Sequence, residues 1–261
     1  MKIKKITITI FLLFAVLLCS CSHYYYMSNI QNVPLFKEKN ECRLSLAAAA
    51  GEEISGTEVQ GAYSVTDNFA IMTNFMLAES GDNSKNNWGK GNYIDGAIGY
   101  YKPLDEFAVF EIYGGFGASK QHHQYANNNY NNGTSDLSFT KLFLQPSIGL
   151  TFNAFDIALS TRICNLSFFK IDNQIDKRNS EFYYLDTIAQ NRNSYLLETA
   201  LTIRGGWKYV KVQLQFGGLK NFTNPNLRFE THYGSISLYI TIAKRYGNMF
   251  RKKTDKYNRN K

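Results

Sequence analysis

The side chains best suited to chemistry in this sequence are few and scattered. His122 and His123 stand next to each other and could offer imidazole nitrogens to a metal ion. Neighbouring side chains of an extended chain point to opposite sides, and no carboxylate or cysteine clusters beside this pair. We therefore interpret the two histidines as polar loop residues, and we expect neither a metal nor any other cofactor.

The cysteines offer a second kind of chemistry, near the N-terminus. Three lysines among the first five residues precede an apolar run over residues 6–18. This run is shorter than the ~20 apolar residues of a membrane-spanning helix and fits a secretory signal. It ends in Leu18-Cys19-Ser20-Cys21, which resembles a bacterial lipobox. The resemblance implies cleavage after Ser20 and thioether lipidation of Cys21.

In the lipoprotein family that this motif indicates, the cysteine becomes triacylated, with palmitate among the chains, and several acyl chains anchor a protein stably. Ser22 stands where that family's sorting rule associates Asp with the inner membrane, so the resemblance implies the outer membrane. Cys19 fits the motif less well, because the bulky Leu18 would occupy the cleavage position. An ordinary signal peptide with incidental cysteines remains the alternative.

The net charge of +8 is concentrated at the two ends of the chain. Residues 1–21 contribute +3 and residues 244–261 contribute +7, which leaves −2 for the body. The basic total therefore does not indicate a nucleic-acid binder, and an exported chain meets no nucleic acid. We expect residues 245–261 to form a disordered basic tail.

Alternation of apolar and polar residues dominates the chain after residue 21 and predicts ten β-strands. Each is about ten residues long, which suits a tilted strand that crosses a hydrocarbon layer. The predicted strands are residues 41–50, 56–65, 69–78, 91–101, 106–118, 138–151, 155–168, 194–205, 208–220 and 232–244. Pro146 cannot donate to a strand ladder, so we predict a local bulge there.

The two faces of these strands differ in charge. The apolar faces of the sixth, eighth, ninth and tenth strands carry no charge. The polar faces of the strands carry Glu58, Asp95, Glu111, Asp156, Glu198, Lys141, Arg162, Arg204 and Lys211. A Lys or Arg that faced lipid at mid-depth would cost ~2–4 kcal/mol, so we expect all nine charges to point inward and to pair there. Side chains nearly fill a barrel of this size, and we therefore predict a plugged polar lumen.

The connections between the predicted strands alternate in length. Tight turns follow the second, fourth, sixth and eighth strands, whereas residues 79–90, 119–137 and 169–193 are predicted long loops. This asymmetry is typical of an outer-membrane barrel whose short turns face the periplasm. An even number of strands would place both termini on the short-turn side, where an acylated Cys21 could reach the inner leaflet. Aromatic residues at the strand ends, among them Tyr101, Trp207, Phe168 and Tyr233, fit interfacial belts.

Two further stretches resemble a family of uncharacterised outer-membrane β-barrel lipoproteins. They are NVPLFKEKNE at residues 32–41 and VQGAYSVTDNFAIMTN at residues 59–74. In that family a similar stretch follows the lipidated cysteine and opens a β-barrel. The resemblance covers the lipobox and roughly residues 32–78, and it implies location and architecture without any activity.

Two classes of barrel enzyme provide alternatives. Omptin-type proteases use Asp and His groups at the outer rim, where Glu79, His123, Asp136 and Asp186 could lie, but no local motif matches. Lipid A deacylases use a His and a Ser two residues apart, and Gly234 stands where that Ser would follow His232. We therefore expect no enzymatic activity.

The sequence thus predicts an all-β chain that folds as one antiparallel up-and-down transmembrane β-barrel of about ten strands, with eight or twelve as alternatives. We expect a signal peptide (1–20), a lipid-anchored N-terminal linker (21–40), the barrel (41–244) and the tail (245–261). Cys42 and Cys164 lie on opposite strand faces, which predicts two free thiols.

The predicted role is that of a monomeric, non-enzymatic lipoprotein of the cell outer membrane, anchored through Cys21. We expect it to contact outer-membrane lipids and to serve a structural or surface-interaction role with an unidentified surface or cell-wall partner. The alternative is a lipid-tethered soluble β-barrel that binds an apolar ligand in the periplasm, because strand alternation alone does not say which face points outward.

Overall fold

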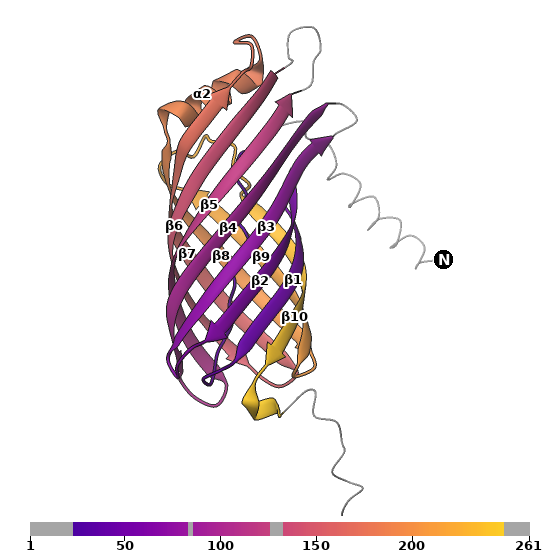
Figure 1. The fold of residues 1–261 in the computed structure, drawn as a ribbon, viewed down its shortest axis with the longest axis vertical. Coiled ribbons are helices and arrows are strands. Elements are labelled where there is room, and N and C mark those ends of the chain that lie inside the picture. The colour runs from indigo at the N-terminus through magenta and orange to yellow at the C-terminus, as the bar shows by residue number, and fades with distance from the viewer. Residues whose placement is uncertain (1–22, 83–85, 126–132, 248–261) are drawn as a thin grey trace, which may run out of the picture.

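The strands close into one barrel (Figure 1). The computed structural model describes residues 23–82, 86–125 and 133–247. Every strand in these ranges pairs antiparallel with its neighbours along the chain, and the first strand closes onto the last. They are β1 (Cys42–Ala50), β2 (Ile54–Ser64), β3 (Phe69–Asp82), β4 (Asn87–Pro103), β5 (Ala108–Tyr125), β6 (Gly133–Thr151), β7 (Phe155–Asn173), β8 (Asn193–Gly206), β9 (Val210–Asn221) and β10 (His232–Ile242). The predicted up-and-down barrel of ten strands is confirmed.

The outward face of the barrel is apolar. Leu46, Ile98, Leu142 and Leu159 are each at least 60% exposed, whereas the nine charges predicted to point inward are each at most 4% exposed. An apolar surface of this extent is unfavourable in water and is accommodated by acyl chains, so it is the surface of a transmembrane barrel. The predicted orientation of both strand faces is confirmed.

The four strands β4 to β7 are longer than predicted. They have 17 to 19 residues, against the ~9–11 that cross a hydrocarbon layer. The surplus extends the barrel wall at the upper end in Figure 1. Most of the predicted loops 79–90 and 119–137 therefore consists of paired strand. Few residues there are apolar, so the alternation of apolar and polar residues fades, whereas backbone pairing between strands needs no apolar face.

A short helix was missed in the predicted loop 169–193. Helix α2 (Ser180–Gln190) follows β7, and the side chain of its N-cap, Asn179, accepts a hydrogen bond from the backbone N–H of Glu181. Its buried residues Glu181, Leu185 and Ile188 recur at helical spacing. None of the helices in the described ranges is long and apolar enough to cross a membrane.

The bulge predicted at Pro146 is absent. Leu144 pairs with Ile163 and Ser147 with Ser160, so the register of β6 against β7 is the same on both sides of the proline. The register instead shifts between Ser138 and Phe139. Pro146 thus interrupts the ladder without inserting a residue, since it lacks only the donor.

The aromatic belts are confirmed only in part. Phe107, Phe155 and Trp207 at the short-turn end are between 41% and 78% exposed and face outward. Tyr101, Phe168 and Tyr233 were expected in the belts as well, but they are at most 5% exposed and face the lumen. The presence of an aromatic residue does not determine whether its side chain faces the lumen or the membrane, because aromatic rings pack well both in the barrel interior and at the membrane interface.

The basic segment that follows β10 is ordered at its start. Lys244–Tyr246 forms a 3₁₀ turn, η2, and the Arg245 guanidinium forms ion pairs with Glu38 and Glu41. The expectation of disorder from residue 245 is therefore wrong for 245–247. Residues 248–261 lie outside the described ranges, as do residues 1–22 with Cys21.

Candidate functional site, a lumen filled by the N-terminal segment

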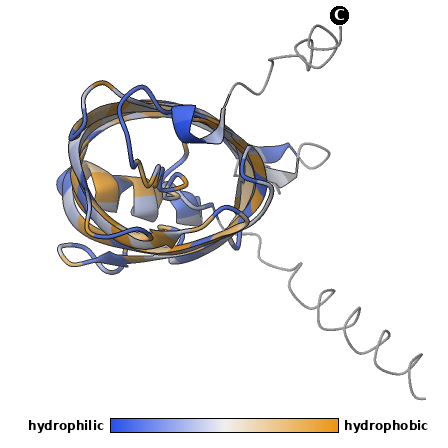
Figure 2. Cartoon of the chain, turned by 90° about the horizontal axis from the view of Figure 1, so that it is seen from below, coloured by the Kyte–Doolittle hydropathy of each residue, from blue (hydrophilic) through white to orange (hydrophobic). Residues whose placement is uncertain are grey.

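Residues 23–36, which we call the plug segment, run through the inside of the barrel. Figure 2 looks along the barrel and shows chain inside the ring of strands. Tyr25, Ile30, Val33 and Phe36 of the plug segment have no exposed surface. The described part of the predicted linker, 23–40, is thus mostly an internal element. The lumen is filled by main chain as well as by side chains.

The plug segment enters at the long-loop end and leaves at the short-turn end. The His23 imidazole is hydrogen-bonded to Asn87 at the start of β4, with 2.8 Å between Nε2 and Oδ1. The Tyr24 hydroxyl donates to Glu52, between β1 and β2, over 3.1 Å. At the other end, Lys37 Nζ donates to the carbonyl of Thr151, the last residue of β6, over 3.2 Å. The N-terminal end of the plug segment therefore lies opposite to the short-turn side where we expected it.

The upper part of the plug segment is bound by α2 and by residues 228–230. Tyr25 OH donates to Glu181 Oε2 over 2.8 Å, and the other oxygen of this carboxylate accepts from Arg228 Nη1 over 2.8 Å. Tyr26 forms a parallel bridge with Phe229, and the backbone N–H of Glu230 donates to the Tyr26 carbonyl. The missed helix therefore covers the end of the plug segment.

Asn29 connects charges of both signs at mid-height. Its Oδ1 accepts from Arg162 Nη1 over 2.6 Å and from Lys141 Nζ over 2.8 Å. Its Nδ2 donates to Asp95 over 3.2 Å and to Glu58 over 3.4 Å. A carboxamide suits this position, because one end accepts and the other donates.

Main-chain groups of the central plug segment bind to side chains of the wall. Gln31 and Gln215 form a reciprocal pair: the Gln31 N–H donates to Gln215 Oε1 over 2.8 Å, and Gln215 Nε2 donates to the Gln31 carbonyl over 2.9 Å. The Ile30 N–H donates to Glu58 over 2.9 Å, and the Asn32 carbonyl accepts from Gln145 over 2.8 Å. These hydrogen bonds replace those that the main-chain N–H and C=O groups of an extended segment would otherwise make to water.

The lower plug segment is bound by two arginines. Arg204 Nη2 donates to the Val33 carbonyl over 2.6 Å, and Arg43 Nε donates to the Pro34 carbonyl over 3.1 Å. The Phe36 N–H donates to Glu111 over 2.9 Å. Arg43 is 3% exposed and belongs to the lumen, although we did not count it among the inward charges.

The inward charges pair only in part among themselves. Lys141 and Arg162 face Glu198 over 3.7 and 3.2 Å, and Lys211 and Arg204 face Asp156 over 2.6 and 3.8 Å. Glu58 and Glu111 instead bond to the plug segment: each accepts from one of its main-chain N–H groups, and Glu58 also accepts from the Asn29 side chain. The expectation that the nine charges satisfy one another is therefore incomplete, because the plug segment is itself a partner.

Of the residues considered for an omptin-type protease, Glu79 and His123 line one small pocket at the rim, whereas Asp136 and Asp186 bond to other residues. His122 Nδ1 lies 2.8 Å from Asp136 Oδ1, whereas His123 is buried against the rings of His23, Tyr25 and Tyr125. Asp186 lies on α2 and accepts from Gln190, and Glu79 is paired in register with Lys90 of β4. Across the described ranges, no three His, Cys, Asp or Glu residues are placed to hold a metal.

Beside the rim, in the connection between β7 and α2, Arg178 hydrogen-bonds the Asp176 side chain. These hydrogen bonds hold the pKa of the Asp176 carboxyl at about 2, below its ordinary value of 3.8.

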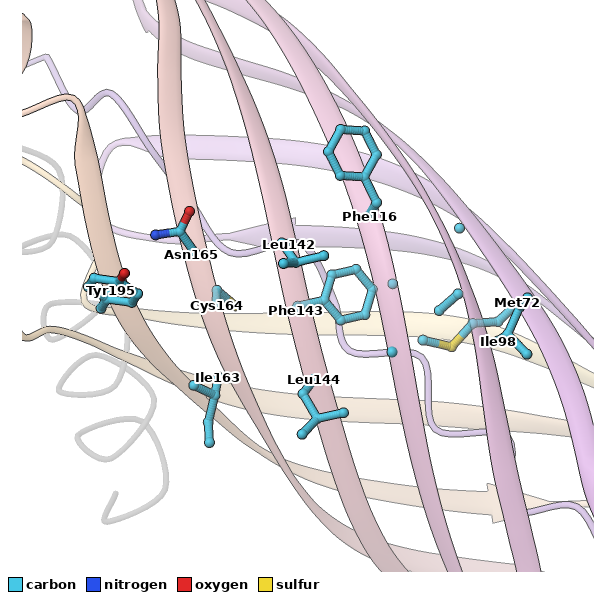
Figure 3. Close-up of a pocket in the computed structure, with 14 residues that line it drawn as sticks. Met72, Ile98, Phe116, Leu142, Phe143, Leu144, Ile163, Cys164, Asn165 and Tyr195 are labelled. Atoms are coloured by element: carbon cyan, nitrogen blue, oxygen red, sulfur yellow. The ribbon is translucent and has the colours of Figure 1, made fainter.

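The outer wall carries an apolar groove of about 880 Å³ (Figure 3). It lies where Gly96 of β4 and Gly114 of β5 leave the wall without side chains, between Ile98, Phe116 and Leu142. All of these residues face outward, so the groove opens toward the surrounding acyl chains rather than into the lumen.

The remaining cysteines behave as expected. Cys42 and Cys164 are both free thiols, the first half-buried and the second buried. This confirms the prediction that they do not form a disulfide.

The plug segment had a signal in the sequence that our interpretation missed. Residues 23–36 contain no Asp, Glu, Lys or Arg, and they combine aromatic residues with amides. A solvated linker is ordinarily rich in charge and in Gly, Ser or Pro. The composition therefore favours a buried segment with polar contacts, although it does not say where that segment lies.

Comparison with known proteins yields similar solved structures but no sequence match. No family model and no curated protein matches the chain. The translocator domain of the autotransporter NalP from Neisseria meningitidis is 8% identical, with a TM-score of 0.46 over 78% of this chain and 86% of that one. The outer membrane protease OmpT from Escherichia coli is 9% identical, with a TM-score of 0.41 over 79% and 96% of the two chains. The KdgM porin is 10% identical, with a TM-score of 0.37 over 77% and 99%. The barrel assignment rests on the strand pairing described above.

Proposed function

We propose that this chain is a non-enzymatic outer-membrane lipoprotein, acylated at Cys21, with a structural or surface-interaction role at its long-loop end. The observation that carries the proposal is the plug segment inside a barrel with an apolar exterior. Such a molecule is held in a membrane by its wall and offers no open path through its interior.

The long-loop end is the part built for contact with other molecules. There the strands β4 to β7 continue past the length needed to cross the hydrocarbon layer, and α2 lies beside them (Figure 1). Tyr183 on α2 is 69% exposed and Phe222 after β9 is 59% exposed. Exposed aromatic rings on a rigid extension suit recognition of a surface partner.

The soluble alternative requires the opposite orientation. A tethered barrel that binds an apolar ligand would have its apolar faces inside, yet Leu214 is 41% exposed and Arg204 is 1% exposed. The lumen that would hold such a ligand is occupied by the plug segment. The geometry therefore favours the transmembrane barrel.

Lipidation and membrane location are tested together by comparing the natural chain with Cys21→Ala in cells fed a clickable palmitate analogue. We expect the label on the natural chain only, and both chains in the outer-membrane fraction when the export signal is cleaved by another route. Unboiled samples should migrate differently from boiled ones, as folded membrane barrels do. A natural chain that carries no acyl label, or that is extracted by carbonate, contradicts the proposal.

A further inference from the structure

We infer that the mature N-terminus is delivered through the barrel to the long-loop end, so that the acyl group on Cys21 sits in the outer leaflet at the cell surface. This inference rests on the proposed lipidation for its acyl group. It rests on the described plug segment for its direction.

The direction follows from contacts at both ends of the plug segment. His23 and Tyr24 bind Asn87 and Glu52 at the long-loop end. Thirteen residues later, Phe36 and Lys37 bind Glu111 and the Thr151 carbonyl near the short turns. Between them, Arg162, Gln215 and Arg204 each bind a different residue of the plug segment, in order down the lumen. The order of these bonds fixes the direction of the chain.

The short distance between Cys21 and His23 then determines which leaflet of the membrane can hold the acyl group. Cys21 is two residues before His23, and two residues span at most ~7 Å. The apolar band of a membrane barrel is ~25 Å tall. An acyl group on Cys21 therefore cannot lie in the inner leaflet while His23 is bound at the long-loop end. Anchoring in the inner leaflet and occupation of the lumen by the plug segment exclude each other.

The contacts of the plug segment favour occupation of the lumen over anchoring in the inner leaflet. Withdrawing it would leave Glu58, Glu111, Arg43 and Arg204 in the lumen without the main-chain partners described above. A buried charge that loses its partner is strongly unfavourable. The surface-anchored state keeps all these contacts.

Cysteine labelling on intact cells tests the inference. In a background with Cys42→Ala and Cys164→Ala, Tyr24→Cys reports the start of the plug segment. Tyr183→Cys on α2 is the matched reference for the long-loop end, and Asp67→Cys in the β2–β3 turn is the reference for the short-turn end. With a membrane-impermeant maleimide, we expect Tyr24→Cys to react on intact cells as Tyr183→Cys does, and Asp67→Cys to react only after lysis.

Two results would overturn the inference. The first is reaction of Tyr24→Cys only after lysis, together with Asp67→Cys, which would place the N-terminus in the periplasm. The second is reaction of Asp67→Cys on intact cells while Tyr24→Cys and Tyr183→Cys stay protected, which would invert the barrel. Absence of an acyl label on the natural chain is a different failure, because it removes the proposed lipidation and with it the outer-leaflet anchor. Cys21 would then be a reactive thiol, so the labelling is repeated with Cys21→Ala added to the background, where the maleimide pattern still reports the path of the chain.

Discussion

At the scale of single residues, the lumen depends on groups that satisfy two partners at once. The sequence was sufficient to place nine inward charges, although not Arg43, because lipid excludes charge from the other face. It was not sufficient to find their partners, because Asn29 belongs to a segment that no strand pattern covers. Asn29 joins two cations and two carboxylates that come from different strands, so its role can be recognised only in the closed barrel.

Replacing Asn29 with Leu tests this arrangement. The change removes hydrogen bonds to Arg162, Lys141, Asp95 and Glu58, and we expect it to lower the free energy of unfolding by about 1–3 kcal/mol. Urea unfolding in lipid vesicles, followed by the heat-modifiable band shift, measures the loss. Asn193→Leu at the exposed start of β8 is the control. Equal stability of the two variants would contradict a central role for Asn29.

Close approach of rings to glycines sets a second requirement at this scale. A Cβ at Gly217 would come within 2.0 Å of the Tyr233 ring on the neighbouring strand, whereas a Cβ at Gly234 would meet nothing within 4 Å. We expect Gly217→Ala to destabilise the barrel by about 1–3 kcal/mol through overpacking. Gly234→Ala should be neutral.

The same unfolding assay, run in a Tyr233→Ala background, isolates the contact. Without the ring, Gly217→Ala should cost much less than it does in the natural chain. A cost that is unchanged by removal of the ring would show that strand geometry, and not the tyrosine, requires glycine at 217.

At the scale of elements, the sequence predicted the repeated strands but not helix α2 or the plug segment, each of which occurs once. Ten strands share one alternation, and the number and order of the strands followed from it. Helix α2 has only three buried positions in 11 residues, so its pattern is short. The plug segment has no periodicity at all, because its polar contacts come from strands all around it.

Helix α2 is expected to be held by Glu181, which bonds both Tyr25 and Arg228. Glu181→Ala should release the helix from the plug segment and speed tryptic cleavage after Lys177 and Arg178 several-fold. Asp186→Ala is the matched control, since Asp186 bonds only Gln190 of the same helix among the contacts described. Equal cleavage rates in the two variants would show that α2 is not docked through Glu181.

At the scale of the whole molecule, the barrel is a closed wall around a bound piece of its own chain. The wall is specified by the membrane, which requires paired strands and an apolar outside. The plug segment is held in the lumen by the charged side chains there, since each buried charge needs a polar partner. Together these two demands explain why a chain of near-neutral body carries so many buried charges.

The central claim is that residues 23–36 block the lumen, and single-channel recording in planar bilayers tests it most directly. We predict no steady conductance for the intact chain, and steady conductance for a variant that lacks residues 23–36. A synthetic peptide of residues 23–36 should close that variant again. Steady conductance from the intact, folded chain would contradict the account.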